Sequence, residues 1–318
     1  MRFKHTINVL IDNFRVTYKL LVYLLIVVLI TTGLGAAIVV PFFDRLGHVE
    51  YYTAITEAVR IVLREIIQGN FMSLPEHFET ISTNFTDLLS YLSENPGDLV
   101  LSALGLVFVA LISRFLISLG NYTACALIND KMAMQANSSF CGALIKNLGN
   151  ASLYSVIYMP ISFVYDVACV VVLYLILSAV LGSSPIIAIF LFFVCMVLLT
   201  GVKMLFTTDW LPAIICGKKS VAGALRYSFS RKSGSSGSVY SFFASSAVAI
   251  LAFNVLAAIG TFGAALIITV PLSYLYLLCY ELVNYCDSNE IKYFIDKRTI
   301  IKPEHEQETS REQFLKGE

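Results

Sequence analysis

Charged residues are scarce in this sequence. Of its 318 residues only 14% are charged, 22 basic and 22 acidic, while 57% are hydrophobic. An average soluble domain carries charge on about a quarter of its residues, so this chain has too little polar surface to cover a water-soluble globule. The composition therefore favours a lipid bilayer. The formal net charge of zero gives no basic excess of the kind that binds nucleic acid.

The usual signatures of enzyme, cofactor and metal sites are also missing. The four histidines are scattered over separate loops and tails without HExxH spacing, and neither GxSxG nor a glycine-rich dinucleotide motif occurs. The seven cysteines are an odd number and contain no CxxC pair, which argues against a disulfide framework and against a zinc site. We therefore predict no enzyme activity, no catalytic or metal-binding residue, and no cofactor.

Long apolar runs are what the sequence does contain. A helix satisfies its own backbone hydrogen bonds in lipid, so these runs predict an all-α, polytopic integral membrane helical bundle. A turn is expected at 260–263, because the last run is about twice the length that one crossing needs. Six candidate spans result, the last two sharing one run: Leu20–Phe43, Leu99–Leu119, Pro160–Leu181, Ile186–Phe206 and Val239–Tyr285.

The N-terminus has two interpretations, a cleaved signal peptide or a retained first helix. Nineteen polar and mixed residues precede an apolar run of 24, which is too long for the h-region of a signal peptide and favours a retained helix. The predicted organisation is a cytoplasmic N-terminal segment (1–19), a six-span membrane domain (20–286) with an external insertion (44–98), and a cytoplasmic tail (287–318).

The distribution of lysine and arginine sets the predicted orientation. Basic residues gather before the first span and between spans four and five, whereas Asp44–Asp98 holds three arginines against nine carboxylates. Cytoplasmic loops carry the excess of lysine and arginine. We therefore expect a multi-pass protein of the cell membrane with both termini in the cytoplasm and Asp44–Asp98 outside.

The external insertion is too long for a bare connector and shows two apolar stripes at helical spacing. They predict two amphipathic helices, with Pro75 near the start of the second, that form a hairpin on the outer face. The stripes either pack on each other and the bundle or serve to dock a ligand or partner. Their residues are Ile55, Val59, Val62, Leu63 and Ile66 in the first, and Phe78, Ile81, Phe85, Leu88 and Leu92 in the second.

A basic segment follows the fourth span. Treated as a helix over Lys218–Lys232, it places Val221, Leu225 and Phe229 on one stripe. This layout is typical of an interfacial helix whose cations reach anionic headgroups, and the alternative is a plain positive-inside stop signal. A phosphate loop is excluded because Pro212 stands where its first glycine belongs, and no aromatic ladder supports nucleic-acid binding. The membrane-interface cations are Lys218, Lys219, Arg226, Arg231 and Lys232.

The stretch Thr208–Ser230, TDWLPAIICGKKSVAGALRYSFS, resembles the loop after the fourth span in a group of bacterial six-span membrane proteins. That group includes the membrane domains attached to some glycerophosphodiester phosphodiesterases, together with uncharacterised relatives. The resemblance implies a six-span membrane domain and supplies no catalytic residue. A phosphodiesterase domain is not present in this sequence.

A short internal sequence similarity, which we call the internal echo, involves that segment. Phe140–Leu144 reads FCGAL and Val221–Leu225 reads VAGAL, each followed within two residues by a cation. The match arises either by chance or from two similar units, as internal repeats do in many transporters.

Four ionisable residues fall within predicted spans, all at depths in the inner leaflet: Arg114, Asp166, Lys203 and Glu281. A charge there costs on the order of 2.5–3.5 kcal/mol on insertion scales, so pairing is expected. We predict an ion pair between Arg114 and Asp166, whereas Lys203 is long enough to extend to the interface instead. Asn254, in the outer half of span five, is expected to donate an interhelical hydrogen bond.

These charges allow two functions. If they only fix helix register, the protein is a non-enzymatic membrane component, a scaffold or accessory; if they line a polar cavity, it is a small transporter or permease. The expected partner is the lipid bilayer, with anionic headgroups on the cytoplasmic side and no nucleic acid. A protein partner or a homo-oligomer is compatible with the sequence, which specifies neither.

Overall fold

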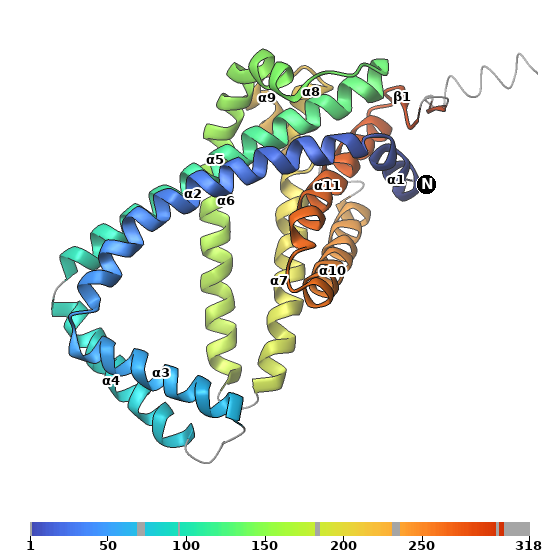
Figure 1. The fold of residues 1–318 in the computed structure, drawn as a ribbon. Coiled ribbons are helices and arrows are strands. Elements are labelled where there is room, and N and C mark those ends of the chain that lie inside the picture. Colours follow the sequence, from blue (N-terminus) through green and yellow to red (C-terminus); the bar gives the residue numbers. More distant parts are fainter. Residues whose placement is uncertain are drawn as a thin grey trace, which may run out of the picture. The chain divides into compact units, whose positions relative to one another are not determined.

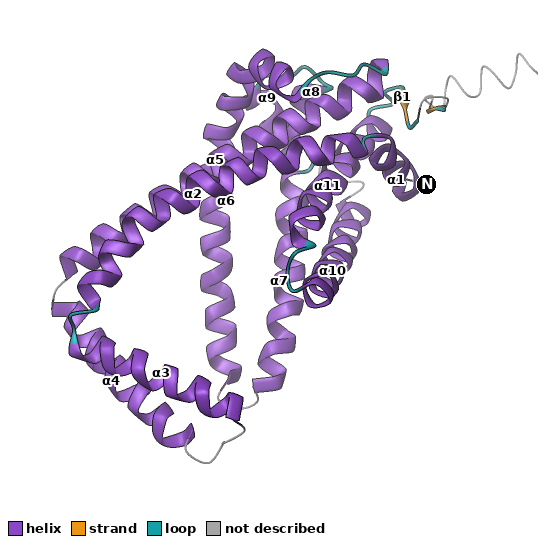
Figure 2. Cartoon of the chain, in the orientation of Figure 1, coloured by secondary structure: helices purple, strands orange, loops and turns teal. Residues whose placement is uncertain are grey.

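The structure is a computed structural model that describes residues 2–68, 74–94, 96–181, 185–230, 236–296 and 299–301. Within these ranges nearly all regular structure is helical (Figures 1 and 2), and six helices are long and apolar enough to cross a membrane. The predicted all-α helical membrane fold is therefore confirmed. The six helices are α2 (Phe14–Leu46), α5 (Pro96–Met134), α6 (Phe140–Leu181), α7 (Pro185–Thr207), α10 (Ser236–Thr261) and α11 (Leu266–Ser288).

Two of these helices are much longer than a membrane crossing. α5 has 39 residues and α6 has 42, whereas about 20 residues span the hydrocarbon core. The predicted spans Leu99–Leu119 and Pro160–Leu181 are therefore parts of helices about twice as long as one crossing needs. The predicted turn between α10 and α11 is present, and the backbone there takes positive φ at Phe262 (49°) and Gly263 (87°).

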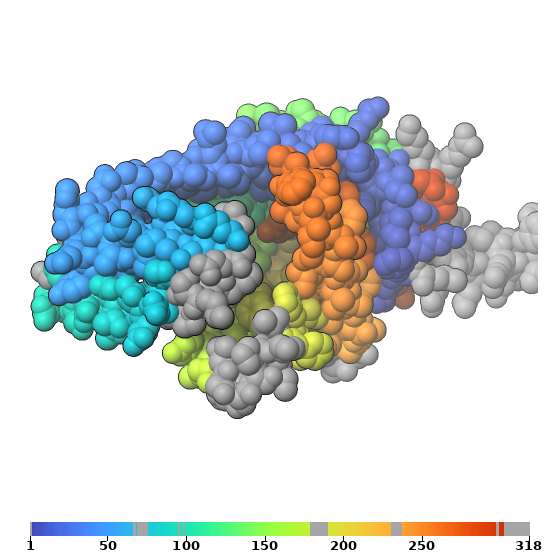
Figure 3. All heavy atoms as spheres, turned by 60° about the horizontal axis from the view of Figure 1, so that its bottom comes forward, coloured from blue at the N-terminus to red at the C-terminus, as the bar shows by residue number. Residues whose placement is uncertain are grey.

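The chain divides into two compact units, Val28–Ser113 and the remainder, Met1–Val27 with Arg114–Glu318. In the first unit, α3 (Glu50–Gln68) and α4 (Leu74–Glu94) lie side by side (Figure 3). Val62 and Leu88 are buried on their apolar stripes. The prediction of two amphipathic helices packed as a hairpin is confirmed by these contacts.

The second unit contains the main core, which we call the basal core. It gathers the ends of α2, α5, α6 and α11 with five short elements: α1 (Arg2–Asp12), α8 (Trp210–Ile215), α9 (Val221–Ser230), β1 (Tyr293–Phe294) and β2 (Ile300–Ile301). Trp210 is 1% exposed, and its indole Nε1 donates to the backbone oxygen of Val221 at 3.2 Å. The rings of Tyr154 and Tyr158 pack edge-on against it, with centroids 5.5 and 5.8 Å away. This core fixes the loops at one end of the helices.

Among the six long helices, α11 is the most enclosed. Half of its most apolar 18-residue window is buried inside the protein, compared with at most 11% in the other five. Its last turns contribute Leu282, Val283 and Tyr285 to the basal core. The apolar side chains of the other five helices therefore face outward, as lipid contact requires.

The first helix, α1, meets the end of α11 at the basal core. The Arg2 Nη1 atom donates to Asn284 Oδ1 at 3.0 Å, and its Nε lies 3.5 Å from Asp287 Oδ2. Tyr293 donates its hydroxyl hydrogen to Asp287 Oδ1 at 2.7 Å, and burial, aided by this bond, raises the pKa of the Tyr293 phenol. α1 and the segment after α11 therefore lie on one membrane face, which requires an even number of crossings.

The basic segment differs from its prediction. Its helix, α9, begins at Val221, and Lys218 adopts a left-handed φ of 49° in the preceding loop. Val221, Ala224 and Ser228 are buried, and Phe229, at the end of the predicted stripe, is 52% exposed. The buried face of α9 packs on the preceding short helix α8, which was not predicted as a separate element. Arg231 and Lys232 lie outside the described residues.

The short internal echo has a structural counterpart. Ser139 precedes α6 and its Oγ accepts a hydrogen bond from the Gly142 amide at 3.1 Å, while Ser220 precedes α9 and accepts from Gly223 at 3.2 Å. Both are N-caps in which the hydroxyl binds the third helical amide. The two FCGAL and VAGAL segments therefore begin helices in the same way.

Candidate functional site

Three of the four predicted intramembrane charges form one ion triad. The Arg114 Nη1 atom on α5 lies 2.5 Å from Asp166 Oδ2 on α6, which is the predicted pair. Lys203 on α7 also binds Asp166, with its Nζ 2.9 Å from Oδ1 and 3.0 Å from Oδ2. The expectation that Lys203 extends to the interface is therefore wrong, because a carboxylate within reach satisfies the ammonium inside the helix layer. One aspartate joins three helices.

Neighbouring groups fix the triad in place. Arg114 Nη1 donates to Ser162 Oγ at 3.0 Å, and its guanidinium lies 5.6 Å from the ring centroid of Phe163. Ser162 and Asp166 are four residues apart and so share one face of α6. Tyr165 donates its hydroxyl hydrogen to the backbone oxygen of Leu199 at 2.8 Å, which ties α6 to α7 again. The arrangement sets the register of α5, α6 and α7.

Glu281 does not join the triad. Its residue is 7% exposed, and among the described residues its carboxyl group has no hydrogen-bond or ion-pair partner. Asp209 lies within electrostatic range, as do Cys125, Tyr154 and Tyr158. The charged neighbour of Glu281 is therefore a second carboxyl group, that of Asp209. The expected pairing of Glu281 with a cation inside the membrane is not found among the described residues.

Asn254 behaves as predicted. Its Nδ2 atom on α10 donates to Ser273 Oγ on α11 at 3.3 Å and to the backbone oxygen of Ile250 at 2.9 Å. The side chain therefore links the two last spans. It contributes to helix packing rather than to either cavity described below.

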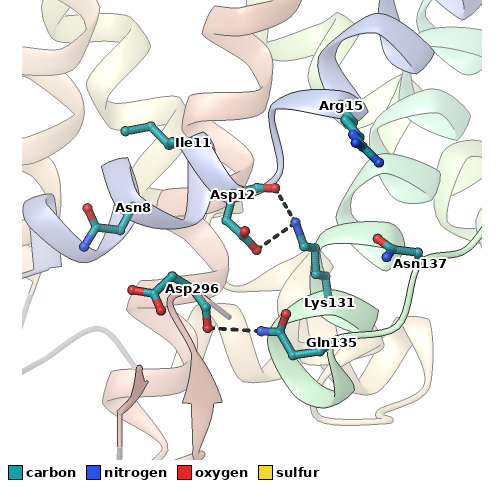
Figure 4. A pocket seen from close by; sticks show the side chains of 8 residues that line it. All are labelled: Asn8, Ile11, Asp12, Arg15, Lys131, Gln135, Asn137 and Asp296. Atoms are coloured by element: carbon teal, nitrogen blue, oxygen red, sulfur yellow. Dashed lines mark hydrogen bonds and ion pairs between the residues drawn. The ribbon is translucent and has the colours of Figure 1, made fainter. Parts of the chain in front are cut away.

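Two cavities open beside the basal core. The larger, about 620 Å³, is lined by Asn8, Ile11, Asp12, Arg15, Lys131, Gln135, Asn137 and Asp296 (Figure 4). Its Lys131 already pairs with the Asp12 carboxylate at 2.7 Å and also donates to the Asp12 backbone oxygen. Gln135 Nε2 donates to the backbone oxygen of Asp296 at 3.2 Å. The polar side chains of Lys131 and Gln135 are therefore already bound to other residues of the cavity wall.

The second cavity, about 410 Å³, contains predicted interface cations. Lys218 and Lys219, from the loop between α8 and α9, line it together with Lys146 from the start of α6. Arg226 is exposed on α9 and is not among the lining residues. Neither cavity is lined by Arg114, Asp166, Lys203 or Glu281.

Among the described residues, no group of three or more His, Cys, Asp or Glu side chains is placed to hold a metal ion. The seven cysteines are all free thiols, and three of them, Cys125, Cys279 and Cys286, are buried.

No protein-family model, curated protein or solved structure matches this chain. The resemblance of Thr208–Ser230 to six-span bacterial proteins therefore stays an expectation from the sequence. The six long apolar helices themselves define the class, a multi-pass helical membrane protein.

Sequence reasoning singled out Lys218 and Lys219 of the second cavity but did not connect them with the other residues that line either cavity. Lys131 and Asp12 are 119 residues apart, and Lys146 lies 72 residues before Lys218, so no local spacing connects them. The one available signal was the single tryptophan, Trp210, which stands in a short apolar run directly before the basic loop. Its burial, with the hydrogen bond to Val221, holds that loop against the basal core.

Proposed function

We propose that the protein is a non-enzymatic component of the cell membrane, a scaffold or accessory protein whose basal core faces the cytoplasm. The observation that carries this proposal is the ion triad. Asp166 accepts from both Arg114 and Lys203, so the three charged groups are paired with one another. None of them lines either cavity. Ion pairs of this kind hold helices in register and leave the charges unavailable to a transported substrate.

The basic loops support the proposed orientation. Lys146, Lys218 and Lys219 lie beside the basal core, which also contains α1 and the end of α11. Lysine-rich and arginine-rich loops mark the cytoplasmic side. The insertion Asp44–Asp98, with its acidic excess, would then lie outside.

A double-mutant cycle on Arg114 and Asp166 tests the structural role of the triad. The single variants Arg114→Met and Asp166→Asn, and the double variant, are compared by unfolding of the purified protein in detergent. We expect Asp166→Asn to lower the free energy of unfolding by about 1–3 kcal/mol, since the side chains are about one-third exposed and the pair is only partly desolvated. The double variant should recover at least about 1 kcal/mol of the summed losses. Strictly additive losses would contradict a stabilising pair.

One observation favours the second candidate, a small transporter. Glu281 is a buried carboxyl group without a described hydrogen-bond partner, and intramembrane carboxyl groups often carry protons. Proteoliposomes with a pH-sensitive dye inside would then show proton uptake under an applied membrane potential, and Glu281→Gln would abolish it. Equal, background-level uptake by both proteins would reject this candidate and leave the scaffold.

A further inference from the structure

The second cavity collects positive charge from segments far apart in the sequence. Lys146 comes from α6, and Lys218 and Lys219 come from the loop between α8 and α9, while Asp130 at the end of α5 is the one carboxylate among its lining residues. The lining therefore contains three lysines and one carboxylate. Among the described residues, neither Lys146 nor Lys218 forms an ion pair or a side-chain hydrogen bond.

The loop that carries two of these lysines is held in place. The amides of Cys216 and Gly217 donate to the backbone oxygen of Pro212 at 2.8 and 3.3 Å, and the Lys219 amide donates to that of Ala213 at 3.1 Å. A Cβ atom at Gly217 would overlap the Tyr285 hydroxyl, so only glycine lets the loop lie this close to α11. The backbone of the two lysines is therefore anchored to the buried helix α8.

Side chains in the wall are also oriented. The Lys219 ammonium lies 3.2 Å from the ring centroid of Tyr227, and this cation–π contact fixes its position. Asn129 accepts a hydrogen bond from the Cys216 thiol on its Oδ1 atom at 3.1 Å, and its Nδ2 atom has no hydrogen-bond acceptor among the described residues. The wall thus combines cations with an amide donor, and its remaining lining residues include Asn147, Asn150, Ile214 and Met134.

This combination matches the chemistry of a phosphate group. Lysine ammonium groups bind phosphate oxygens as point charges, and charge-assisted hydrogen bonds are the stronger kind. The volume of about 410 Å³ falls within the range of small-ligand sites, roughly 300–1,000 Å³. The cavity also adjoins membrane helices, and basic pockets between such helices bind phosphate headgroups.

We propose that this cavity binds the phosphate group of an anionic phosphate ester. Such a group is supplied either by an anionic phospholipid of the adjoining leaflet or by a soluble phosphate ester. The proposal does not depend on whether the protein is a scaffold or a transporter, because the cavity is separate from the ion triad and from Glu281.

The test uses the full-length protein in nanodiscs of uncharged phosphatidylcholine. In one arm, phosphatidylglycerol is added to the nanodiscs; in the other, glycerol 3-phosphate is titrated into the buffer. Thermal unfolding reports binding, because a ligand that binds the folded state stabilises it. The double variant Lys146→Gln/Lys218→Gln is compared with Arg226→Gln, which removes a nearby exposed cation outside the cavity.

We expect at least one ligand to stabilise the wild-type protein, and the double variant to bind it about tenfold more weakly or worse. Arg226→Gln should bind within about twofold of wild type, since an exposed cation outside the site contributes little. Stabilisation in the phosphatidylglycerol arm alone identifies a lipid headgroup, and stabilisation by glycerol 3-phosphate identifies a soluble ester. Absence of stabilisation in both arms, or an equal loss in Arg226→Gln and the double variant, overturns the proposal. Equal melting of all three proteins without ligand verifies that the variants fold.

Discussion

Two carboxyl groups in the membrane helices experience opposite surroundings. Asp166 lies between two cations, and Glu281, 7% exposed, has no cation as a described partner. A buried charge without a partner is costly, so Glu281 is most easily kept in the membrane as a neutral acid. Replacement of the carboxyl group by an amide should therefore change the free energy of unfolding in opposite directions at the two residues.

We expect Glu281→Gln to leave the free energy of unfolding unchanged or raise it by up to about 1–2 kcal/mol, because the amide keeps the shape and removes the cost of a buried charge. Asp166→Asn is the matched control and should lower it. Chemical or thermal unfolding of both variants in the same detergent makes the comparison. A large loss in Glu281→Gln would mean that its carboxylate has an essential partner.

At the scale of single residues, the sequence identified polar side chains that lie inside long apolar runs. Arg114, Asp166 and Asn254 were found because a polar group inside an apolar run has few ways to be satisfied. The sequence did not determine which of several partners each group takes. Lys203 could reach either the interface or a carboxylate, and only the packing of α7 against α6 places Asp166 within 3.0 Å of its ammonium.

Two helices, α6 and α9, begin with the same local device. In each, a serine caps the helix and a glycine occupies the third helical position. A Cβ atom added at Gly142 would lie 2.7 Å from the Ser139 Oγ atom, and one at Gly223 would lie 3.0 Å from the Ser220 Oγ atom. The glycines thus leave room for the capping hydroxyl groups.

We expect Ser220→Ala to lower the free energy of unfolding by about 0.5–2 kcal/mol through loss of the cap, and Ser139→Ala to do the same at α6. Gly223→Ala should cost less than Gly142→Ala, because its new methyl group approaches the serine less closely. Ser82→Ala on the exposed surface of α4 is the control and should change stability by less than about 0.5 kcal/mol. If both cap variants melted like this control, the caps would contribute nothing to stability.

Element boundaries show where sequence reasoning stops. The existence of every long helix followed from hydropathy, yet α5 and α6 extend well past the predicted spans, because polar residues such as Asn129 and Lys146 continue a helix outside lipid. The helix α8 was missed because six apolar residues beside a membrane span look like the end of that span. Its separate burial is a tertiary effect, set by Tyr154 and Tyr158 from α6.

At the scale of the whole molecule, the contact between α1 and α11 constrains the topology. Arg2 binds both Asn284 and Asp287, so α1 and the end of α11 share one face. This parity agrees with the six long helices in the described residues. Which face is cytoplasmic follows in our proposal from the lysines near the basal core.

Cysteine labelling in intact cells tests that orientation. In a variant with the exposed Cys141 replaced by serine, Ser82→Cys on α4 should react with a membrane-impermeant maleimide added outside. Ala222→Cys on α9 is exposed as well and should react only after the cells are permeabilised. The reverse pattern would invert the proposed topology, and equal labelling of both before permeabilisation would contradict an odd number of crossings between α4 and α9.

The pairing of α1 with α11 has a consequence for biosynthesis. α1 leaves the ribosome before α11, the helix against which it packs, and five membrane helices lie between them in the sequence. α1 therefore lacks its packing partner until those five membrane helices have been synthesised. A chain arrested before residue 266 would leave the apolar face of α1 open to chaperones and proteases.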